Sequence, residues 1–335
     1  MNPSEVLALI ESDVERKFSL LTPVNKCWQP SDFVPDLTKA TWPEDLADFR
    51  KAAQELPDEL LVVLVGAMIT EEALPSYQTS FNRLGDIRDE TGDSPNPWAK
   101  WSRAWTSEEN RHGDLLNRYL YLTGRVNMRA VETSIQHLIR NGFNPQHSND
   151  PYNGLVYTSF QERATRLSHG QVARLSRAAG DAVLGKICNV VAADEARHED
   201  AYKSFMARVF EIDPSGAVLS FETMLTRTIT MPAHLMSDPE DSGIFGCFSS
   251  IAQRLGVYTF SDYISIMEHL IEHWDVTQLT GLSSLAAEAQ NRVCRLPEYY
   301  RKRIGAMEMK LPISKRPYPW IIDREHISQI GCLHG

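Results

Sequence analysis

The sequence predicts an all-α protein built on a four-helix bundle core, with additional helices around the bundle and two metal ions inside it. The motif Glu-x-x-His occurs twice in segments of helical periodicity, as Glu109 with His112 and as Glu195 with His198. Residues three apart in a helix project from one face, so each pair offers a carboxylate and an imidazole to the same point. A bundle that binds two metal ions in this way also needs one lone glutamate from each of two further helices. The hydrophobic pattern contains no convincing strand-rich domain.

Two further helical segments supply the lone glutamates. In the segment that starts at Asp58, Glu71 interrupts an apolar stripe, and Pro75 is expected to kink the helix just beyond it. Glu162 lies on one helical stripe with Thr165. A buried carboxylate is costly unless it is paired or bound to a metal. The predicted set is therefore four carboxylates and two imidazoles, which suit iron or manganese and whose four negative charges balance two divalent ions.

The rest of the chain is expected to form helices around this core, separated by proline and glycine residues. Residues 1–36 are an irregular N-terminal segment that opens with a helix through Glu15 and then turns. Helices are predicted at residues 42–56, from 58 onward, and at 98–122, 128–139, 155–169 and 181–210, with more between 221 and 311. An irregular tail at residues 312–335 follows. We expect residues 1–335 to form a single domain.

Composition argues against several classes of protein. Acidic residues outnumber basic ones by 44 to 34, giving a net charge of -10, which argues against a general nucleic-acid binder. The five cysteines are odd in number and contain no C-x-x-C, so neither a disulfide framework nor a zinc ribbon is indicated. No apolar run reaches the roughly 18 to 20 residues that cross a bilayer. We therefore expect a soluble protein with no membrane or nucleic-acid partner.

Neighbours of the predicted ligands are candidates for supporting roles. Asp194, adjacent to Glu195, could accept the second ring N–H of a metal-bound histidine. The Thr165 hydroxyl could face an oxygen species on the metals or bond back to its own helix. Glu108 projects about a hundred degrees away from Glu109 on its helix, which makes it a poorer choice of ligand.

Four runs of this sequence resemble the plant acyl-[acyl-carrier-protein] desaturases, which are stearoyl-specific in their common form and belong to the ferritin-like di-iron proteins. The runs are MITEEALP at 68–75, RAWTSEENRHGDLL at 103–116, YTSFQERAT at 157–165 and MPAHLM at 231–236. The likeness extends from about residue 26 to 320. It implies a homodimer in the plastid (chloroplast) stroma, with two iron ions per subunit. It also implies that reduced ferredoxin supplies electrons, that O2 is the oxidant, and that a saturated chain on acyl carrier protein receives a cis double bond.

The resemblance also implies roles for individual residues. The iron ligands of the family fall on Glu71, Glu109, His112, Glu162, Glu195 and His198, the six residues chosen from spacing. Thr165 resembles the hydroxyl that lies near bound oxygen, as a catalytic residue. Trp28, Trp105 and Asp194 resemble positions beside an electron route to the irons.

The resemblance leaves the chain length and the double-bond position open. Ser80, Phe81 and Arg83 depart from the common stearoyl pattern. Stearoyl with a Δ9 bond is therefore the default, and palmitoyl or a Δ4 or Δ6 position are alternatives. Because acyl carrier protein is acidic, docking needs local basic residues, for which Arg227, Lys302 and Arg303 are candidates.

Two other functions use similar ligands. An iron-storage or ferroxidase bundle is the main alternative, although its subunit is normally far shorter. A radical-generating reductase subunit would need a tyrosine near one iron, for which Tyr77, Tyr157 and Tyr202 are available.

Overall fold

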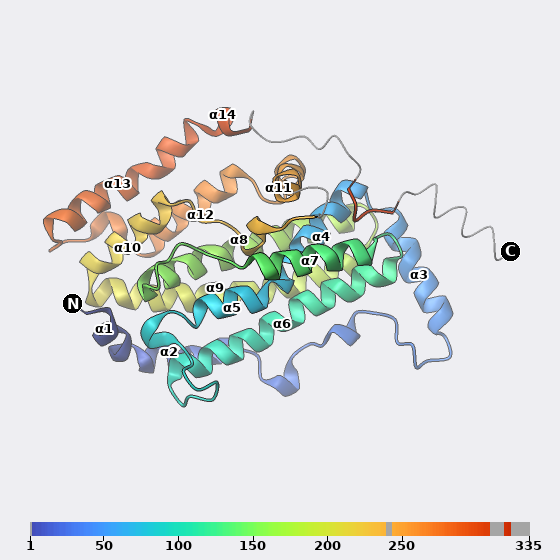
Figure 1. The fold of residues 1–335 in the computed structure, drawn as a ribbon, viewed down its shortest axis with the longest axis horizontal. Coiled ribbons are helices and arrows are strands. Elements are labelled where there is room, and N and C mark those ends of the chain that lie inside the picture. Colours follow the sequence, from blue (N-terminus) through green and yellow to red (C-terminus); the bar gives the residue numbers. More distant parts are fainter. Residues whose placement is uncertain (1, 239–242, 309–317, 323–335) are drawn as a thin grey trace.

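The computed structural model describes residues 2–238, 243–308 and 318–322. Within these ranges the chain is helical, and its only extended pairing is an isolated bridge between Val126 and Ile321. Four helices form the central bundle: α4 (Asp58–Glu72), α6 (Pro97–Thr123), α8 (Pro151–Ala178) and α9 (Ala182–Ile212). Figure 1 shows them running side by side along the long axis of the molecule. α8 packs most extensively against α9, and α4 packs against α6. The predicted four-helix bundle is confirmed.

Polar caps and a glycine fix the ends of the bundle helices. Gly124 ends α6 with φ at 68°, a left-handed conformation that glycine adopts without strain. Asp181 caps α9 by accepting a hydrogen bond from the N–H of Leu184 at 2.8 Å. The same carboxylate accepts from the hydroxyl of Tyr119 on α6 at 2.6 Å. The connection between α8 and α9 is thereby tied to α6.

α4 is the most apolar bundle helix and is buried on nearly every side. It ends at Glu72, and α5 (Leu74–Phe81) continues at an angle of 41°. Pro75 lies in the first turn of α5, where its missing N–H is tolerated, so the predicted kink is confirmed. In the described part of the chain, no single helix has the length and hydropathy of a membrane span, and α4 and α5 reach them only as a bent pair.

The other helices surround the bundle. They are α1 (Pro3–Leu9), α2 (Glu11–Lys17), α3 (Trp42–Gln54), α7 (Met128–Asn141), α10 (Pro214–Thr226), α11 (Ile244–Leu255), α12 (Phe260–His273), α13 (Ser284–Arg301) and α14 (Ile304–Glu308). Short 3-10 turns lie at Phe18–Leu20, Val24–Lys26, Pro30–Asp32, Gly85–Ile87, Pro232–Leu235 and Val276–Gln278. The helix predicted through Glu15 is present as α1 and α2, separated at Ile10.

Some helix boundaries differ from the sequence prediction, and α8 extends beyond the predicted 155–169 at both ends. α10 starts at Pro214, ahead of the expected residue 221, because Asp213 caps it by accepting from the N–H of Gly216 at 3.1 Å. Of the irregular tail expected at 312–335, residues 312–317 and 323–335 lie outside the described residues. Within the described part of the tail, Trp320 is fully buried and its indole N–H donates to Ser134 of α7 at 3.0 Å.

The hydrophobic core consists of two clusters that follow one another along the bundle. On α9, Ile187 belongs to one cluster and Phe205 to the other, and Glu195 lies between them. On α6, Trp105 and Leu115 likewise belong to different clusters on either side of the first Glu-x-x-His motif. The polar residues of both motifs are therefore enclosed between two apolar cores.

Candidate metal centre

Six acidic and histidine side chains from the four bundle helices meet between these cores. They are Glu71, Glu109, His112, Glu162, Glu195 and His198, each no more than 5% exposed. Their donor atoms form two groups, in each of which all atoms lie within 4.8 Å of one another. Glu109 and Glu195 belong to both groups, as carboxylates that bridge two ions would. Glu71 and His112 complete the first group, and Glu162 and His198 complete the second.

Four donor atoms of this centre are buried without a hydrogen-bond partner in the described chain. They are Nδ1 of His112, Nδ1 of His198, Oε1 of Glu109 and Oε1 of Glu195. Nδ1 of His198 lies 2.7 Å from Oε1 of Glu109, and Nδ1 of His112 lies 3.2 Å from Oε1 of Glu195. These atoms face one another closely but without hydrogen-bond geometry, and such crowding of buried donor atoms at one point indicates a ligand from outside the chain. The donor set and its four negative charges fit two divalent ions such as iron or manganese.

Each imidazole is held by a buried carboxylate that lies outside the two metal groups. Nε2 of His112 on α6 lies 3.4 Å from Oδ2 of Asp194 on α9. Nε2 of His198 on α9 lies 3.0 Å from Oε2 of Glu108 on α6. A metal-binding histidine commonly donates its second ring N–H to such a carboxylate, which fixes the tautomer. Burial would raise the pKa of Asp194, but His112 and Arg197 lower that pKa to about 2.

Burial and crowding shift the acid–base properties of the ligands in the metal-free chain. Burial, and then the charges of Glu109 and Glu162, raise the pKa of Glu195 well above its ordinary value. Burial alone would lower the pKa of His112, but the surrounding carboxylates, Glu109 first, hold it well above its ordinary value. The same balance raises the pKa of His198. Metal ions must therefore compete with protons for this site.

Two indole rings contact the centre. The Nε1–H of Trp105 donates to Oε1 of Glu162 at 3.1 Å. The Nε1–H of Trp28 donates to Oδ2 of Asp194 at 3.2 Å, and its ring stacks on His112 with centroids 6.1 Å apart. These contacts form a continuous path of side chains from Trp28 through Asp194 to His112.

Two further residues of α8 face the centre. The hydroxyl of Thr165 donates to the backbone carbonyl of Glu162 at 3.0 Å, which is the bond back to its own helix, and Thr165 also lines the adjoining pocket. Nε2 of His169 lies 2.9 Å from Oε1 of Glu71. Both side chains lie on the same helical stripe as Glu162.

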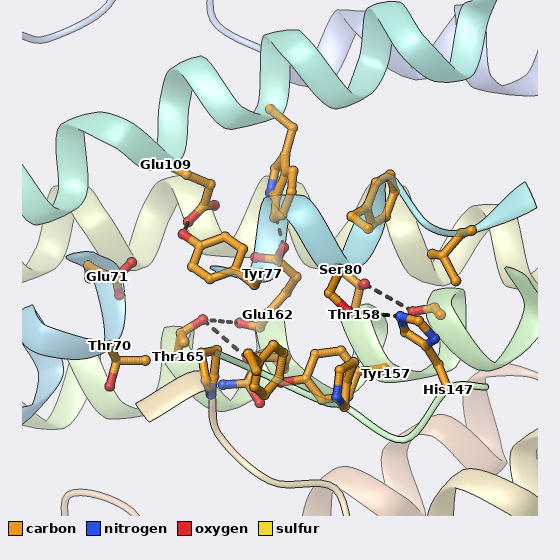
Figure 2. A pocket seen from close by; sticks show the side chains of 18 of the residues that line it. Thr70, Glu71, Tyr77, Ser80, Glu109, His147, Tyr157, Thr158, Glu162 and Thr165 are labelled. Atoms are coloured by element: carbon orange, nitrogen blue, oxygen red, sulfur yellow. Dashed lines mark hydrogen bonds between the residues drawn. The ribbon is translucent and has the colours of Figure 1, made fainter. Parts of the chain in front are cut away.

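An apolar pocket adjoins the metal centre. Its lining includes Tyr77, Phe81, Leu84, Trp105, Phe143, Pro145, Tyr157 and Pro232, together with four carboxylate ligands and Thr165. Figure 2 shows Glu71, Glu109 and Glu162 toward one end of the pocket, and Ser80 and His147 toward the other. The lining suits an apolar ligand that reaches the metal centre.

The end of the pocket away from the metals is closed by a polar pair and a tight contact. The backbone N–H of Asn149 donates to Nδ1 of His147 at 3.0 Å, so the neutral ring carries its hydrogen on Nε2 and donates it to Oγ of Ser80 at 2.9 Å. Burial lowers the pKa of His147, which favours this neutral form. Beside this pair, the side chain of Leu84 packs against Gly154, where an added Cβ would come within 2.4 Å of it.

The basic residues considered for docking have other contacts. Arg227 donates to Ser148 Oγ at 3.0 Å and to the carbonyl of Gln146, and so fastens the loop that carries His147. Lys302 and Arg303 contact side chains of α13.

Glu108 is the supporting residue that sequence reasoning missed. Helical geometry ranked it correctly as a poor ligand, yet it holds His198 from the neighbouring helix. A signal for it was available, because both motifs read acidic-Glu-x-Arg-His, as 108–112 and as 194–198. Asp194 and Glu108 occupy equivalent positions in these motifs. His147 gave no such signal, since it lies in an irregular loop.

The chain is similar to known proteins over most of its length. A family model described as fatty acid desaturase matches residues 2–322. The stearoyl-[acyl-carrier-protein] 9-desaturase, chloroplastic, of Olea europaea is 53% identical over 307 residues, which are 91% of this chain and 79% of that protein. The acyl-[acyl-carrier-protein] desaturase, chloroplastic, of Cucumis sativus is 54% identical over 308 residues, which are 91% of this chain and 77% of that protein.

A solved structure supports the fold. The X-ray structure of DesA2 from Mycobacterium tuberculosis H37Rv, described as a candidate acyl-ACP desaturase, matches with a TM-score of 0.55 at 15% identity, covering 82% of this chain and 97% of that chain. At this identity the likeness bears on the fold alone. The family match and the sequence relatives together establish that this chain belongs to the fatty acid desaturase family.

Proposed function

We propose that this chain is an acyl-[acyl-carrier-protein] desaturase that introduces a cis double bond into a saturated acyl chain. The observation that carries this proposal is the apolar pocket, whose lining includes the four buried carboxylates of a centre that, together with two imidazoles, could hold two metal ions. The middle of an acyl chain has no polar handle, so only the shape of an apolar pocket can position one methylene against an oxidising centre. The relatives from Olea europaea and Cucumis sativus are named for this activity.

The centre would hold two iron ions per subunit, one at each metal group, with Glu109 and Glu195 belonging to both groups. When bound, such a pair supplies the capacity to use O2 as an oxidant of an unactivated methylene. In the balanced reaction the acyl chain loses two hydrogen atoms from neighbouring carbons. These two hydrogen atoms, two electrons from reduced ferredoxin and two protons together reduce one O2 to two water molecules.

The protein side chains would position the ions, the protons and the substrate. Trp105 and His169 orient Glu162 and Glu71, each of which belongs to one metal group. The Thr165 hydroxyl, on the pocket wall beside the centre, is the candidate proton donor. Trp28 would begin the electron route, through hydrogen bonds to Asp194 and on to His112.

The distance from the metals to the closed end of the pocket would select the carbon that is oxidised. Stearoyl with a Δ9 bond is the default because the relative from Olea europaea is named for it. The Ser80–His147 pair makes palmitoyl, or a Δ4 or Δ6 position, the alternatives to test.

The partners follow from the same chemistry. Acyl carrier protein would present the chain, ferredoxin would bring electrons, and two subunits would form a homodimer. The relatives named above are chloroplastic, which supports a place in the plastid stroma.

Reconstitution tests the proposal. The purified protein would be mixed with iron, NADPH, ferredoxin, ferredoxin reductase and acyl carrier proteins bearing chains of several lengths, and the products analysed by mass spectrometry. We expect one monounsaturated product that requires both O2 and ferredoxin. No unsaturated product with any chain length would overturn the proposal, and iron oxidation and storage without product would identify the iron-storage alternative.

A further inference from the structure

A stretch of the N-terminal chain lies against the outer side of the metal centre. Residues 20–28, here called the strap, follow α2 and pass beside α6 and α9 (Figure 1). The middle of the strap, residues 23–26, is exposed, whereas Thr22 and Trp28 at its two ends are partly buried.

Both ends of the strap donate hydrogen bonds to the carboxylates that hold the two imidazoles. The backbone N–H of Thr22 donates to Oε1 of Glu108 at 2.7 Å. The indole N–H of Trp28 donates to Oδ2 of Asp194 at 3.2 Å. Each of these carboxylates therefore receives one donor from the strap and one imidazole.

Two arginines from the equivalent positions of the two motifs bind the strap in return. Nε of Arg197 donates to the carbonyl of Leu20 at 2.8 Å, and Nη1 of Arg111 donates to the carbonyl of Trp28 at 2.7 Å. Arg197 also links the two carboxylates, because its Nη2 lies 3.1 Å from Oε2 of Glu108 and 2.7 Å from Oδ1 of Asp194. Two carboxylates and two guanidinium groups make this outer layer electrically neutral.

We propose that Arg197 is a positioning residue that aligns both metal-binding imidazoles at once, and that docking of the strap is coupled to metal binding through it. The inference rests on the proposed metal centre and adds to it. Arg197 orients Glu108 and Asp194, and these orient His198 and His112. Detachment of the strap removes one donor from each carboxylate, although Arg197 still contacts both and Arg111 still donates to Asp194 at 3.0 Å. The imidazoles are then held less firmly, so metal binding favours the docked strap, and by linkage the docked strap favours metal binding.

The first experiment measures metal affinity by competition with a chelator, using Co2+ as the probe. We expect Arg197→Gln to weaken binding about 10–100-fold, the usual effect of losing a group that orients a ligand. Arg197→Lys, which keeps one charged donor, should recover part of this loss. Arg208→Gln is the matched control. Arg208 also ties α9 to the N-terminal region, through Asp13 at 3.3 Å, but contacts neither Glu108 nor Asp194. The Arg208→Gln variant should therefore bind Co2+ as tightly as the wild type does.

The second experiment follows the strap itself. Hydrogen exchange at the Thr22 amide and tryptic cleavage after the exposed Lys26 both report detachment of the strap. Adding Co2+ to the wild type should slow both, and in Arg197→Gln this protection should be largely lost. If Arg197 had a merely structural role, Arg197→Gln would raise hydrogen exchange and cleavage of the strap by the same factor with and without Co2+.

Trp28→Phe supplies an independent variant, because it removes one donor of the strap and leaves Arg197 in place. It should also weaken Co2+ binding, and circular dichroism would verify that each variant is folded. Failure of the wild type to bind Co2+ at all would overturn the proposed metal centre. This inference would be overturned if folded Arg197→Gln bound Co2+ with wild-type affinity, or if Co2+ changed neither hydrogen exchange nor tryptic cleavage in the wild-type strap. Neither result would contradict the proposed metal centre.

Discussion

Nε2 of His169 on α8 lies 2.9 Å from Oε1 of Glu71 on α4, so a buried imidazole from one bundle helix orients a candidate metal ligand on another. Both side chains are at most 5% exposed. Glu71 belongs to one metal group only. The two metal positions therefore depend on different supporting residues, and they can be weakened separately.

Replacement of His169 should weaken one metal position and spare the other. His169→Leu leaves Glu71 without its orienting donor, which should lower the affinity of that position about 10–100-fold. His169→Gln, which retains an N–H donor of similar reach, should bind more tightly than His169→Leu. Titration with Co2+, followed by visible absorption, should then show two unequal steps in His169→Leu. Two steps of wild-type affinity would contradict the role assigned to His169.

Removal of Glu162 should affect the other metal position. Glu162→Ala deletes a ligand that only the second metal group contains, so bound iron should fall and turnover should cease, while circular dichroism retains the helical signal. Glu72→Ala is the control, because Glu72 lies beside a ligand on α4 but in neither metal group. Iron analysis and the product assay measure both outcomes. Full iron loading in Glu162→Ala would remove Glu162 from the ligand set.

The sequence predicts the parts of this molecule that obey local rules. Helical spacing places the six ligand candidates on inward faces because three- and four-residue steps repeat the same direction on a helix. Pro75 predicts the break between α4 and α5, because proline cannot continue the hydrogen bonding of a helix interior. Gly124 predicts the end of α6 through its access to positive φ.

Features that depend on the packing of distant segments were beyond local rules. Glu108 supports a histidine on a different helix, which follows only from how α6 and α9 face one another. His147 reaches the pocket from a loop in which Gln146, Ser148 and Asn149 all have positive φ, a conformation that Gln and Ser rarely adopt. The strap contacts carboxylates more than eighty positions away along the chain.

The affinity for metal should rise with pH. The surrounding carboxylates raise the pKa values of His112 and His198 well above their ordinary value, which favours the positively charged rings in the metal-free chain. Each proton that a metal ion displaces steepens the dependence by about tenfold per pH unit. Co2+ competition between pH 6 and pH 8, corrected for the titration of the chelator, measures this slope.

The same groups predict the pH dependence of stability without metal. A raised pKa in the folded chain means that folding binds protons, so these histidines stabilise the metal-free protein at low pH and that contribution is lost as the pH rises through their folded pKa. Thermal unfolding of metal-free and Co2+-loaded protein should therefore diverge as the pH increases. A metal affinity that does not change with pH would show that metal binding displaces no proton from these rings.

The polar pair at the closed end of the pocket should control which acyl chain is accepted. Ser80→Ala leaves the Nε2–H of His147 buried without an acceptor, which should cost about 1–3 kcal/mol in the free energy of unfolding. Ser80→Ala combined with His147→Leu removes both partners and presents an apolar surface, so its stability should lie closer to the wild type. The terminal methyl group of a longer chain should then be tolerated at this surface.

The product assay with palmitoyl, stearoyl and longer acyl carrier proteins tests this expectation. In the double variant the ratio of long-chain to palmitoyl turnover should rise roughly tenfold, which corresponds to about 1.4 kcal/mol. Arg227→Gln is the control, because Arg227 fastens the same loop through Ser148 from its exposed side and does not line the pocket. A shift of equal size in Arg227→Gln would assign the effect to loosening of the loop. An unchanged ratio in the double variant would mean that Leu84, packed against Gly154, sets the depth of the pocket without help from the polar pair.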